Sequence, residues 1–241
     1  MSSYVGISSK ARALSKVYVG VGGKAREVTK AYVGVSSKAR LCYEGGRYIK
    51  DIAEGTTINV LESGTLTPFV VAKHNYESSL NGTGKHLLVR AKLLSDKRKM
   101  NTAYWDTDTN VRTWLSSTYA SRLDASFKTH ISKVTFYYRR HGSMKTLANQ
   151  QYFIPSMYDA DDWSQTVMNT IGAALGEGVK YALRDTNDVN PNNSDDEGDY
   201  YYCGSCITSS SRYLFLTYSS YSAYDTIRPC FCVDDTAQEA L

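Results

Sequence analysis

Between residues 56 and 94 the chain contains three apolar runs, which read Thr56-Thr-Ile-Asn-Val-Leu61, Leu66-Thr-Pro-Phe-Val-Val-Ala-Lys-His74 and Lys85-His-Leu-Leu-Val-Arg-Ala-Lys-Leu-Leu94. Short runs rich in Val, Ile and Phe are typical of β-strands. The intervening segments, Glu62-Ser-Gly64 and Asn81-Gly-Thr-Gly84, have the composition of turns. The sequence therefore predicts an antiparallel meander in this part of the chain.

Two helices are expected after the meander. Asp106-Thr-Asp-Thr109 offers N-caps, and it precedes apolar residues at helical spacing, namely Val111, Trp114, Leu115, Tyr119 and Leu123. A second helix is expected to follow Asp159-Ala-Asp-Asp162 and to end at Gly176 or Gly178, with apolar residues four apart at Trp163, Val167, Ile171 and Leu175. Acidic residues at both starts suit the positive end of the helix dipole. Both tryptophans are expected in the core.

Two further extended segments complete the expected fold. Ile131–Arg140 places Val134, Phe136 and Tyr138 on one face, and Ile227–Val233 predicts a last strand. The fold class is therefore α+β over residues 46–241, with two helices and antiparallel strands. Asp185–Asp199 is predicted to be a polar loop.

The first 45 residues carry a repeat with a period of 14 residues. Its units are Tyr4-Val-Gly-Ile-Ser-Ser-Lys-Ala-Arg12, Tyr18-Val-Gly-Val-Gly-Gly-Lys-Ala-Arg26 and Tyr32-Val-Gly-Val-Ser-Ser-Lys-Ala-Arg40. A β-forming run, a two-residue small linker and a second run are typical of a hairpin. Because so short a unit cannot bury its own apolar face, the repeat predicts an assembly module, with side-by-side identical chains as partners.

Charge is divided unevenly along the chain. Residues 1–50 hold ten Lys and Arg against two Asp and Glu, residues 51–154 hold fourteen against eight, and residues 155–241 hold four against fourteen. The overall net charge of +4 is therefore an average over two basic segments and one acidic segment. Such asymmetry indicates that the two ends meet different partners.

The tyrosines are concentrated near the C-terminus. Seven of the 20 tyrosines lie within residues 200–224, where they are mixed with serine. Tyrosine supplies a large contact area at low entropic cost and serine supplies adaptable hydrogen bonds, so this mixture is typical of binding loops. The segment therefore predicts a recognition surface, and we expect about half of its side chains to point inward wherever it forms a strand.

The sequence lacks the motifs of common enzymes and of membrane proteins. No stretch approaches the roughly 18 apolar residues of a membrane-spanning helix, and the first residues have no apolar segment of a secretory signal. The four histidines are scattered, and no zinc-protease, serine-hydrolase, P-loop or dinucleotide motif occurs. We expect no catalytic residue, no membrane insertion and no nucleic-acid partner, because the basic units lack interleaved aromatic residues.

No cofactor is expected, although two metal alternatives stay open. Cys203, Cys206, Cys230 and Cys232 could supply four thiolates to zinc. Free thiols are the favoured interpretation, because synthesis in a reducing cytoplasm disfavours disulfides, Cys42 included. The acidic residues of the 185–199 loop could hold Ca²⁺, but their spacing does not match an EF-hand, and a solvated loop is favoured.

The chain also resembles known proteins. The repeats, ending in Leu41-Cys-Tyr-Glu-Gly-Gly46, are similar to N-terminal repeats of tail and tail-fibre-associated proteins of phages and prophages. The remainder resembles a C-type-lectin-like domain at Tyr104-Trp-Asp-Thr-Asp-Thr-Asn-Val-Arg-Thr-Trp-Leu115, Tyr152-Phe-Ile-Pro-Ser156 and Ile227-Arg-Pro-Cys-Phe231. Tyr202-Cys-Gly-Ser205 departs from the Trp-Leu-Arg-Ser-type strand frequent in that family.

This resemblance implies a receptor-binding protein at a phage tail tip, made in the host cytoplasm, in which residues 1–45 form trimers and attach to other virion tail proteins. The domains that this chain resembles include the variable proteins of diversity-generating retroelements. In those proteins, adenine-directed mutagenesis changes the C-terminal residues that face the ligand. The ligand would be a host-cell surface protein or glycan. The candidate ligand-binding residues are Tyr200, Tyr201, Tyr202, Ser205, Ser209, Ser211, Tyr213, Tyr218, Ser220, Tyr221 and Tyr224.

Two alternatives to a receptor-binding protein stay open. Formylglycine-generating enzymes share a related fold, and in that case Cys230 or Cys232 would be catalytic. The other alternative is a purely structural virion subunit that binds no ligand.

Overall fold

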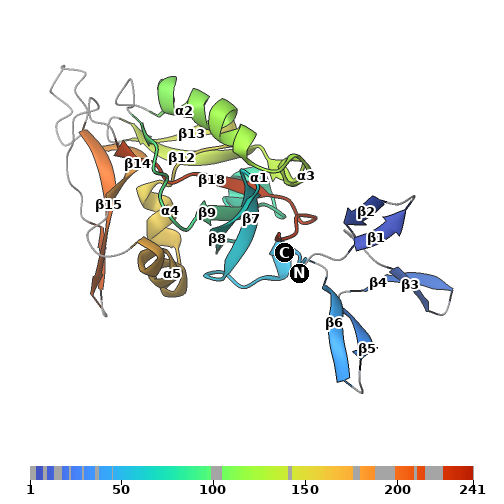
Figure 1. Cartoon of the computed structure of the whole chain (residues 1–241). Coiled ribbons are helices and arrows are strands. Elements are labelled where there is room, and N and C mark those ends of the chain that lie inside the picture. Colours follow the sequence, from blue (N-terminus) through green and yellow to red (C-terminus); the bar gives the residue numbers. More distant parts are fainter. Residues whose placement is uncertain are drawn as a thin grey trace.

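The chain forms a mixed α+β structure in which the strands are mostly antiparallel (Figure 1). A computed structural model describes residues 4–7, 10–13, 18–21, 23–28, 30–35, 38–44, 46–98, 105–140, 143–175, 180–187, 199–208, 211–214 and 225–240. The α+β class expected from the sequence is therefore confirmed.

A five-stranded antiparallel sheet forms the centre of the structure. Its strands lie in the order β11 (Ile131–Ser132), β18 (Cys230–Val233), β9 (His86–Arg90), β8 (Thr65–Lys73) and β7 (Thr57–Glu62). The consecutive pairing of β7, β8 and β9 confirms the meander. The C-terminal strand β18 lies between β9 and β11, and all four of its residues are buried.

The connections of the meander follow from local chemistry. Ser63 and Gly64 both have positive φ, 52° and 75°, as a two-residue type I′ hairpin turn requires. A helical turn, α1 (Ser78–Asn81), lies between β8 and β9 and was not predicted. β9 ends earlier than expected, because the Arg90 guanidinium donates to the carbonyls of Lys92 and Leu93 and the chain turns away from the sheet.

The first helix lies where the sequence predicts it. It runs through α2 (Asn110–Trp114), a π-helical turn η2 (Leu115–Tyr119) and a 3₁₀ turn η3 (Ala120–Arg122). The Asp108 carboxylate caps it by accepting hydrogen bonds from the backbone N–H groups of residues 110, 111 and 112. The predicted stripe is buried at every position, namely Val111, Trp114, Leu115, Tyr119 and Leu123.

The second helical region differs from the prediction. Asp159 does not precede a helix but lies inside α4 (Met157–Asp162), which Ser156 caps, and Trp163 lies beyond its end. A separate helix, α5 (Gln165–Leu175), follows with no acidic residue in its first turn. The helix α4 ends at Trp163, whose backbone is extended, with φ −69° and ψ 138°. Trp163 and Trp114 are buried, as expected.

Three more groups of strands lie outside the central sheet. β12 (Val134–Arg140) buries the three predicted side chains and pairs with β13 (Ser143–Gln150), a mostly exposed strand that was not predicted. β10 (Lys97–Arg98) pairs with β17 (Asp225–Thr226). β14 (Lys180–Asn187), β15 (Asp199–Thr208) and β16 (Ser211–Leu214) form a three-stranded sheet. The loop expected over residues 185–199 is therefore wrong at residues 185–187, which continue β14, and at Asp199, which begins β15. Residues 188–198 lie outside the described residues.

The N-terminal repeats form three separate hairpins. These are β1 (Tyr4–Ile7) with β2 (Lys10–Ala13), β3 (Tyr18–Val21) with β4 (Lys24–Glu27), and β5 (Lys30–Val35) with β6 (Lys38–Glu44). Each uses the same register, in which a valine lies opposite the arginine of its own unit. Val19 and Val21 are 48% and 49% exposed, so their side of hairpin β3–β4 lacks a buried partner surface within the described chain.

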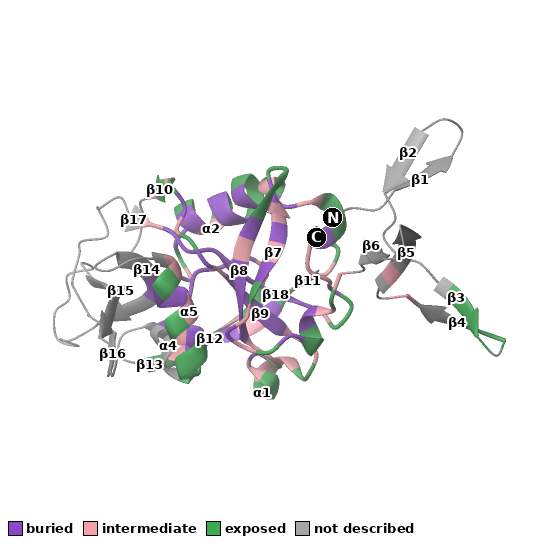
Figure 2. Ribbon diagram, turned by 60° about the horizontal axis from the view of Figure 1, so that its bottom comes forward, coloured by how far each residue is buried: buried purple, intermediate pink, exposed green. Residues whose placement is uncertain are grey.

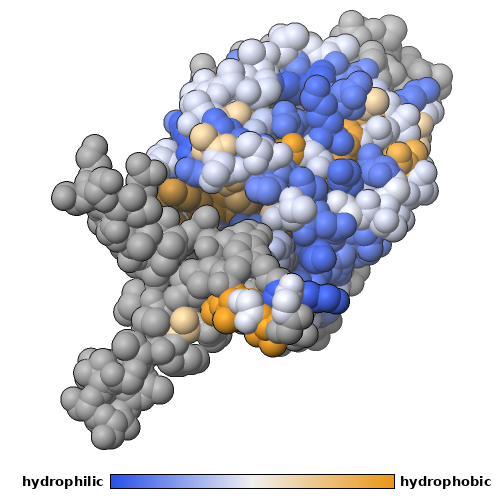
Figure 3. Space-filling model, turned by 90° about the vertical axis from the view of Figure 1, so that its right-hand side faces the viewer, coloured by the Kyte–Doolittle hydropathy of each residue, from blue (hydrophilic) through white to orange (hydrophobic). Residues whose placement is uncertain are grey.

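The core lies around the central sheet. Figure 2 shows the buried residues concentrated on β8, β9 and β18, with exposed residues on the outer side of the helices. Phe231 packs against Phe69, Phe127 and Tyr152. Seen from another side, the described surface is mostly hydrophilic, with small apolar patches (Figure 3). No helix within the described residues is long and apolar enough to cross a membrane.

Candidate functional site

The predicted ligand-binding residues fall into two groups. Tyr200, Tyr201, Tyr202 and Ser205 belong to β15, and Ser211 and Tyr213 belong to β16, whereas Ser209, Tyr218, Ser220, Tyr221 and Tyr224 lie outside the described residues. For the first group the backbone is described and the side chains are not. The structure thus brings six of the eleven candidates together on two adjacent antiparallel strands.

The sheet that carries these six residues is joined to the core through β14. Arg184 of β14 is fully buried, and its backbone N–H donates to the Pro155 carbonyl at 3.0 Å. Its guanidinium donates to the carbonyl of Ile154 at 2.9 Å and to that of Tyr137 at 3.1 Å. The same group lies 4.0 Å above the ring of Phe136. One side chain therefore links β14 to β12 and to the segment before α4.

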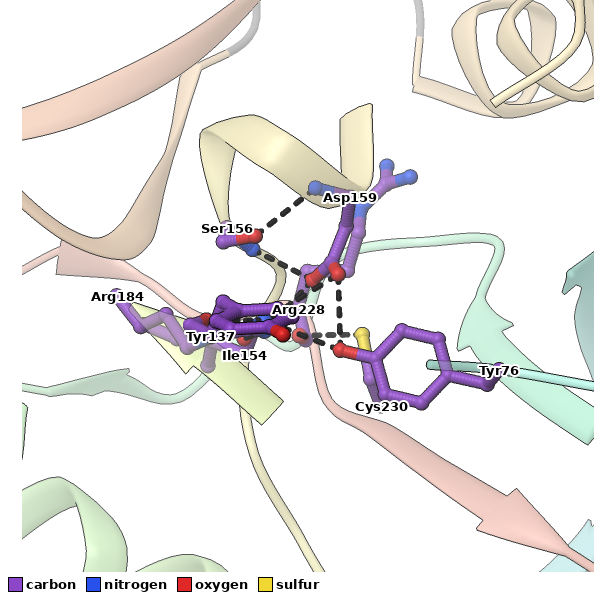
Figure 4. Close-up of polar contacts among 8 residues, drawn as sticks. All are labelled: Tyr76, Tyr137, Ile154, Ser156, Asp159, Arg184, Arg228 and Cys230. Carbon is purple, nitrogen blue, oxygen red and sulfur yellow. Dashed lines mark hydrogen bonds and ion pairs between the residues drawn. The ribbon is translucent and has the colours of Figure 1, made fainter. Parts of the chain in front are cut away.

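The charge of Arg184 is balanced by Asp159 of α4 (Figure 4). Two nitrogens of the guanidinium donate to the two carboxylate oxygens of Asp159, at 2.6 and 3.2 Å. This two-point geometry is the strongest arrangement for an arginine and a carboxylate. Ser156 completes a capping box, since its N–H donates to Asp159 and its hydroxyl accepts from the Asp159 N–H.

Tyr76, which lies in the connection between β8 and β9, also belongs to this hydrogen-bond network. Its hydroxyl donates to Asp159 at 2.8 Å and accepts from Arg184 at 3.1 Å. Burial raises the pKa of Tyr76 well above its ordinary value, so the hydroxyl stays protonated and keeps its role as a donor. The network therefore joins four segments that are distant in the sequence, through groups that all have hydrogen-bond partners.

A cleft of about 190 Å³ lies over one side of this network. Its wall runs along the β8–β9 connection and along α4, and it is lined by Lys73, Asn75, Tyr76, Glu77, Ser78, Ser79, Tyr158, Asp159, Asp162 and Trp163. Lys73 bridges the cleft walls through an ion pair with Asp162 at 2.9 Å. Burial, with Asp159 and Asp162 nearby, raises the pKa of Glu77. The cleft is therefore polar and contains more carboxylates than ammonium groups.

Cys230 and Cys232 lie in the core. Both are fully buried on β18, and burial raises the pKa of both thiols well above the ordinary value. A thiolate is the form that attacks a substrate or binds zinc, so this environment disfavours both roles. No cluster of His, Cys, Asp or Glu that could hold a metal occurs in the described part of the chain. Residues 188–198 and the side chains of Cys203 and Cys206 lie outside it.

Alkylation tests this placement of the two cysteines. We expect iodoacetamide at about pH 8 to leave the peptide containing Cys230 and Cys232 unmodified in the folded protein, because solvent does not reach either sulfur. In denaturant the same peptide should react fully. Mass spectrometry of the peptides measures both. Fast modification of Cys230 in the folded protein would contradict a core position and would favour a reactive cysteine.

Sequence reasoning missed the buried network. In the sequence, Asp159 indicates only a favourable charge at a helix start, and nothing in the local pattern marks Arg184 as its partner. One signal was present: Ser156-Met-Tyr-Asp159 has the spacing of a capping box, which predicts that the helix begins after Ser156. The pairing with Arg184 and Tyr76 has no such signal, because it joins distant segments.

Comparison with known proteins gives one match. The sequence model of a family described as a domain of unknown function (DUF6273) matches residues 83–235. This range begins before β9 and includes the helices α2 to α5 and the strand β18. The comparisons with curated proteins and with solved structures found no match.

Proposed function

The chain belongs to the DUF6273 family, and we propose that it is a receptor-binding protein of a phage tail, with a C-type-lectin-like domain over residues 46–241. Its Tyr- and Ser-rich C-terminal segment binds a protein or glycan on the host-cell surface. The protein acts by binding and not by catalysis, and its place is the tail tip of the virion. The antiparallel strands and the helices α2 and α5 support the proposed fold.

One observation carries this proposal. β15, which begins with Asp199 and three tyrosines, pairs with β14, and β14 is fixed to the core by the buried Arg184. A recognition surface binds more tightly when its backbone is held in place before the ligand arrives, because less conformational entropy is lost on binding. The Arg184 network supplies such support to β14, whose residues on either side of Arg184, Ala182 and Thr186, pair with Tyr202 and Tyr200 of β15.

The composition of the segment supports the same role. Tyrosine residues combine a flat apolar ring with a hydroxyl, and they are frequent among the residues that dominate binding energy. If the segment is diversified by a retroelement, its gene lies near a reverse transcriptase and a near-copy of its own 3′ end. Sequencing of the neighbouring genes decides this part of the proposal, and the absence of both features would refute it.

The N-terminal hairpins fit an attachment module. Their shared register places the apolar residues Val19 and Val21 on one face of β3, and about half of each side chain is exposed. The same Tyr-Val-Gly sequence recurs in all three hairpins, and we propose a homotrimer that docks to other tail proteins through residues 1–45. The basic charge of this region suits an acidic protein partner.

Light scattering and cell binding together test the attachment module. We expect the full chain to have three times the mass of one chain, and residues 46–241 alone to be monomeric. Loss of three-site attachment should weaken binding to host cells by about 10²- to 10⁴-fold, because avidity is lost while each single site is kept. A monomeric full chain would overturn the trimer. Equal binding by both forms would overturn the multivalent mechanism.

A further inference from the structure

Two of the chain's histidines, His86 and His130, lie on either side of one turn near the C-terminus. The turn consists of Asp234, Asp235 and Thr236 and directly follows β18. His86 is buried at the start of β9, and its Nε2 lies 2.9 Å from the Asp235 carboxylate. His130 lies on the other side, 3.4 Å from Asp234 and 3.0 Å from the Thr236 hydroxyl.

His74 and His86 form a continuous chain of short contacts. The Nδ1 atoms of the two rings lie 2.8 Å apart, and the rings meet edge to face. At one end of this chain, His74 Nε2 lies 2.8 Å from the carbonyl oxygen of Ile52. At the other end, His86 Nε2 meets Asp235. Every ring nitrogen of the pair therefore has one polar partner.

The partners fix how many protons the two rings hold. A carbonyl oxygen and a carboxylate only accept, so both Nε2 atoms carry a proton. The two facing Nδ1 atoms need one proton between them. Two protons would clash, and without a proton the two nitrogen lone pairs would face and repel each other. The satisfied pair thus holds three ring protons and one positive charge, next to the negative charge of Asp235. Either a lost or an added proton removes at least one contact.

The surroundings of the pair contain both signs of charge. Glu54 accepts the backbone N–H of His74 at 2.6 Å, and Lys85, next to His86, donates to the Ser132 hydroxyl. Asp235 is 59% exposed at its side chain. The other ionisable groups on the adjoining segments are Lys73, which is paired with Asp162, His130, which is paired with Asp234, and the buried thiol of Cys232.

The turn leads into a segment that holds the start of the domain. We name residues 234–240 the C-terminal strap. Within it, the Ala237 carbonyl accepts from the Ile49 N–H at 2.9 Å, and the Glu239 N–H donates to the Arg47 carbonyl at 3.1 Å. The Glu239 carboxylate also pairs with the Arg47 guanidinium. Residues 46–49 follow β6, the second strand of the last hairpin, which ends at Glu44. The strap therefore binds the segment that connects the hairpins to the domain.

We propose that the His74–His86 pair is a proton-operated clasp: one shared proton gives the pair the positive charge that attracts the Asp235 carboxylate and thereby keeps the C-terminal strap on residues 46–49. Rising pH removes this proton and loosens the strap. Strong acid adds a second proton or neutralises Asp235 and loosens it as well. The attachment of the hairpin segment to the domain is therefore tightest at an intermediate pH.

Hydrogen exchange of the full chain tests the clasp between about pH 5 and pH 9, a range that brackets the ordinary histidine pKa of about 6.5. After correction for intrinsic exchange, we expect protection of the Ile49 and Glu239 amides to fall toward high pH. In Asp235→Asn, a variant at an exposed side chain, the fall should move to lower pH, since the counter-charge is lost. The control His130→Gln should keep the wild-type dependence.

Nitrogen NMR of the histidine rings gives an independent measurement. At intermediate pH we expect three ring protons on His74 and His86 together and one strongly hydrogen-bonded Nδ1 proton, unchanged by a chelator. Two rings that titrate independently, a signal that disappears on removal of metal, or pH-independent protection of the strap would each overturn the proposal. An unshifted dependence in Asp235→Asn would overturn the role of the carboxylate.

Discussion

Replacing Arg184 by methionine should lower the free energy of unfolding by about 3–5 kcal/mol, because the change leaves the Asp159 carboxylate buried without its cation. The hydrogen bonds to the carbonyls of Ile154 and Tyr137 are lost as well. A loss of this size is a large part of the stability of an ordinary domain. Chemical denaturation monitored by tryptophan fluorescence measures it, since Trp163 lies in the adjoining core.

Two comparisons separate the buried pair from a general effect of removing a cation. Lys73→Met removes the partner of Asp162 in a pair whose side chains are 32% and 67% exposed, and it should cost about 1 kcal/mol or less. Asp159→Asn combined with Arg184→Met should recover part of the loss, since no uncompensated charge remains. If Arg184→Met alone is no worse than Lys73→Met, the network does not hold β14 in place.

Replacing Tyr218 and Tyr221 together by alanine should weaken binding to host cells by about 100-fold or more. Each tyrosine that dominates an interface contributes about 2 kcal/mol or more when truncated, although such losses do not add strictly. The melting temperature should change little, because the proposed role of both side chains is to meet the ligand. A binding assay and a thermal melt on the same preparations measure the two effects.

The control for this pair is a tyrosine outside the segment. Tyr48→Ala removes a partly exposed ring next to the strap and should leave ligand binding within about twofold of the wild type. A double variant that unfolds would assign Tyr218 and Tyr221 to the core. A folded double variant with full binding would refute the proposed recognition surface.

Local patterns were sufficient to predict much of the fold. The hairpin repeats, the meander and the helix from Asn110 depend on turn residues, caps and apolar spacing within a few residues, so the sequence contains their signals. β13 lacked such a signal, because its residues are mostly exposed and show no apolar alternation. The break at Trp163 was missed because the apolar spacing continues through it, although Ser156 and Asp159 form the cap of a separate helix.

Long-range pairings could not be predicted in the same way. Arg184 and Asp159 meet only after β14 packs beside α4, and His74 meets His86 only when β8 and β9 pair. The position of β18 between β9 and β11 is another example, because a short buried run can join any sheet that covers both of its faces. The role of the Tyr- and Ser-rich segment stays a prediction, since its side chains lie outside the described residues.

Site-specific photo-crosslinking tests the central claim most directly. A photoreactive phenylalanine analogue placed at Tyr218 or Tyr221 of the full chain should crosslink to a component of the host-cell surface. The same analogue at Leu66 or Met144, two exposed apolar positions on β8 and β13, should not. Crosslinks that form only from the C-terminal positions would agree with recognition by this segment. Crosslinks from Leu66 or Met144, with none from Tyr218 and Tyr221, would contradict it.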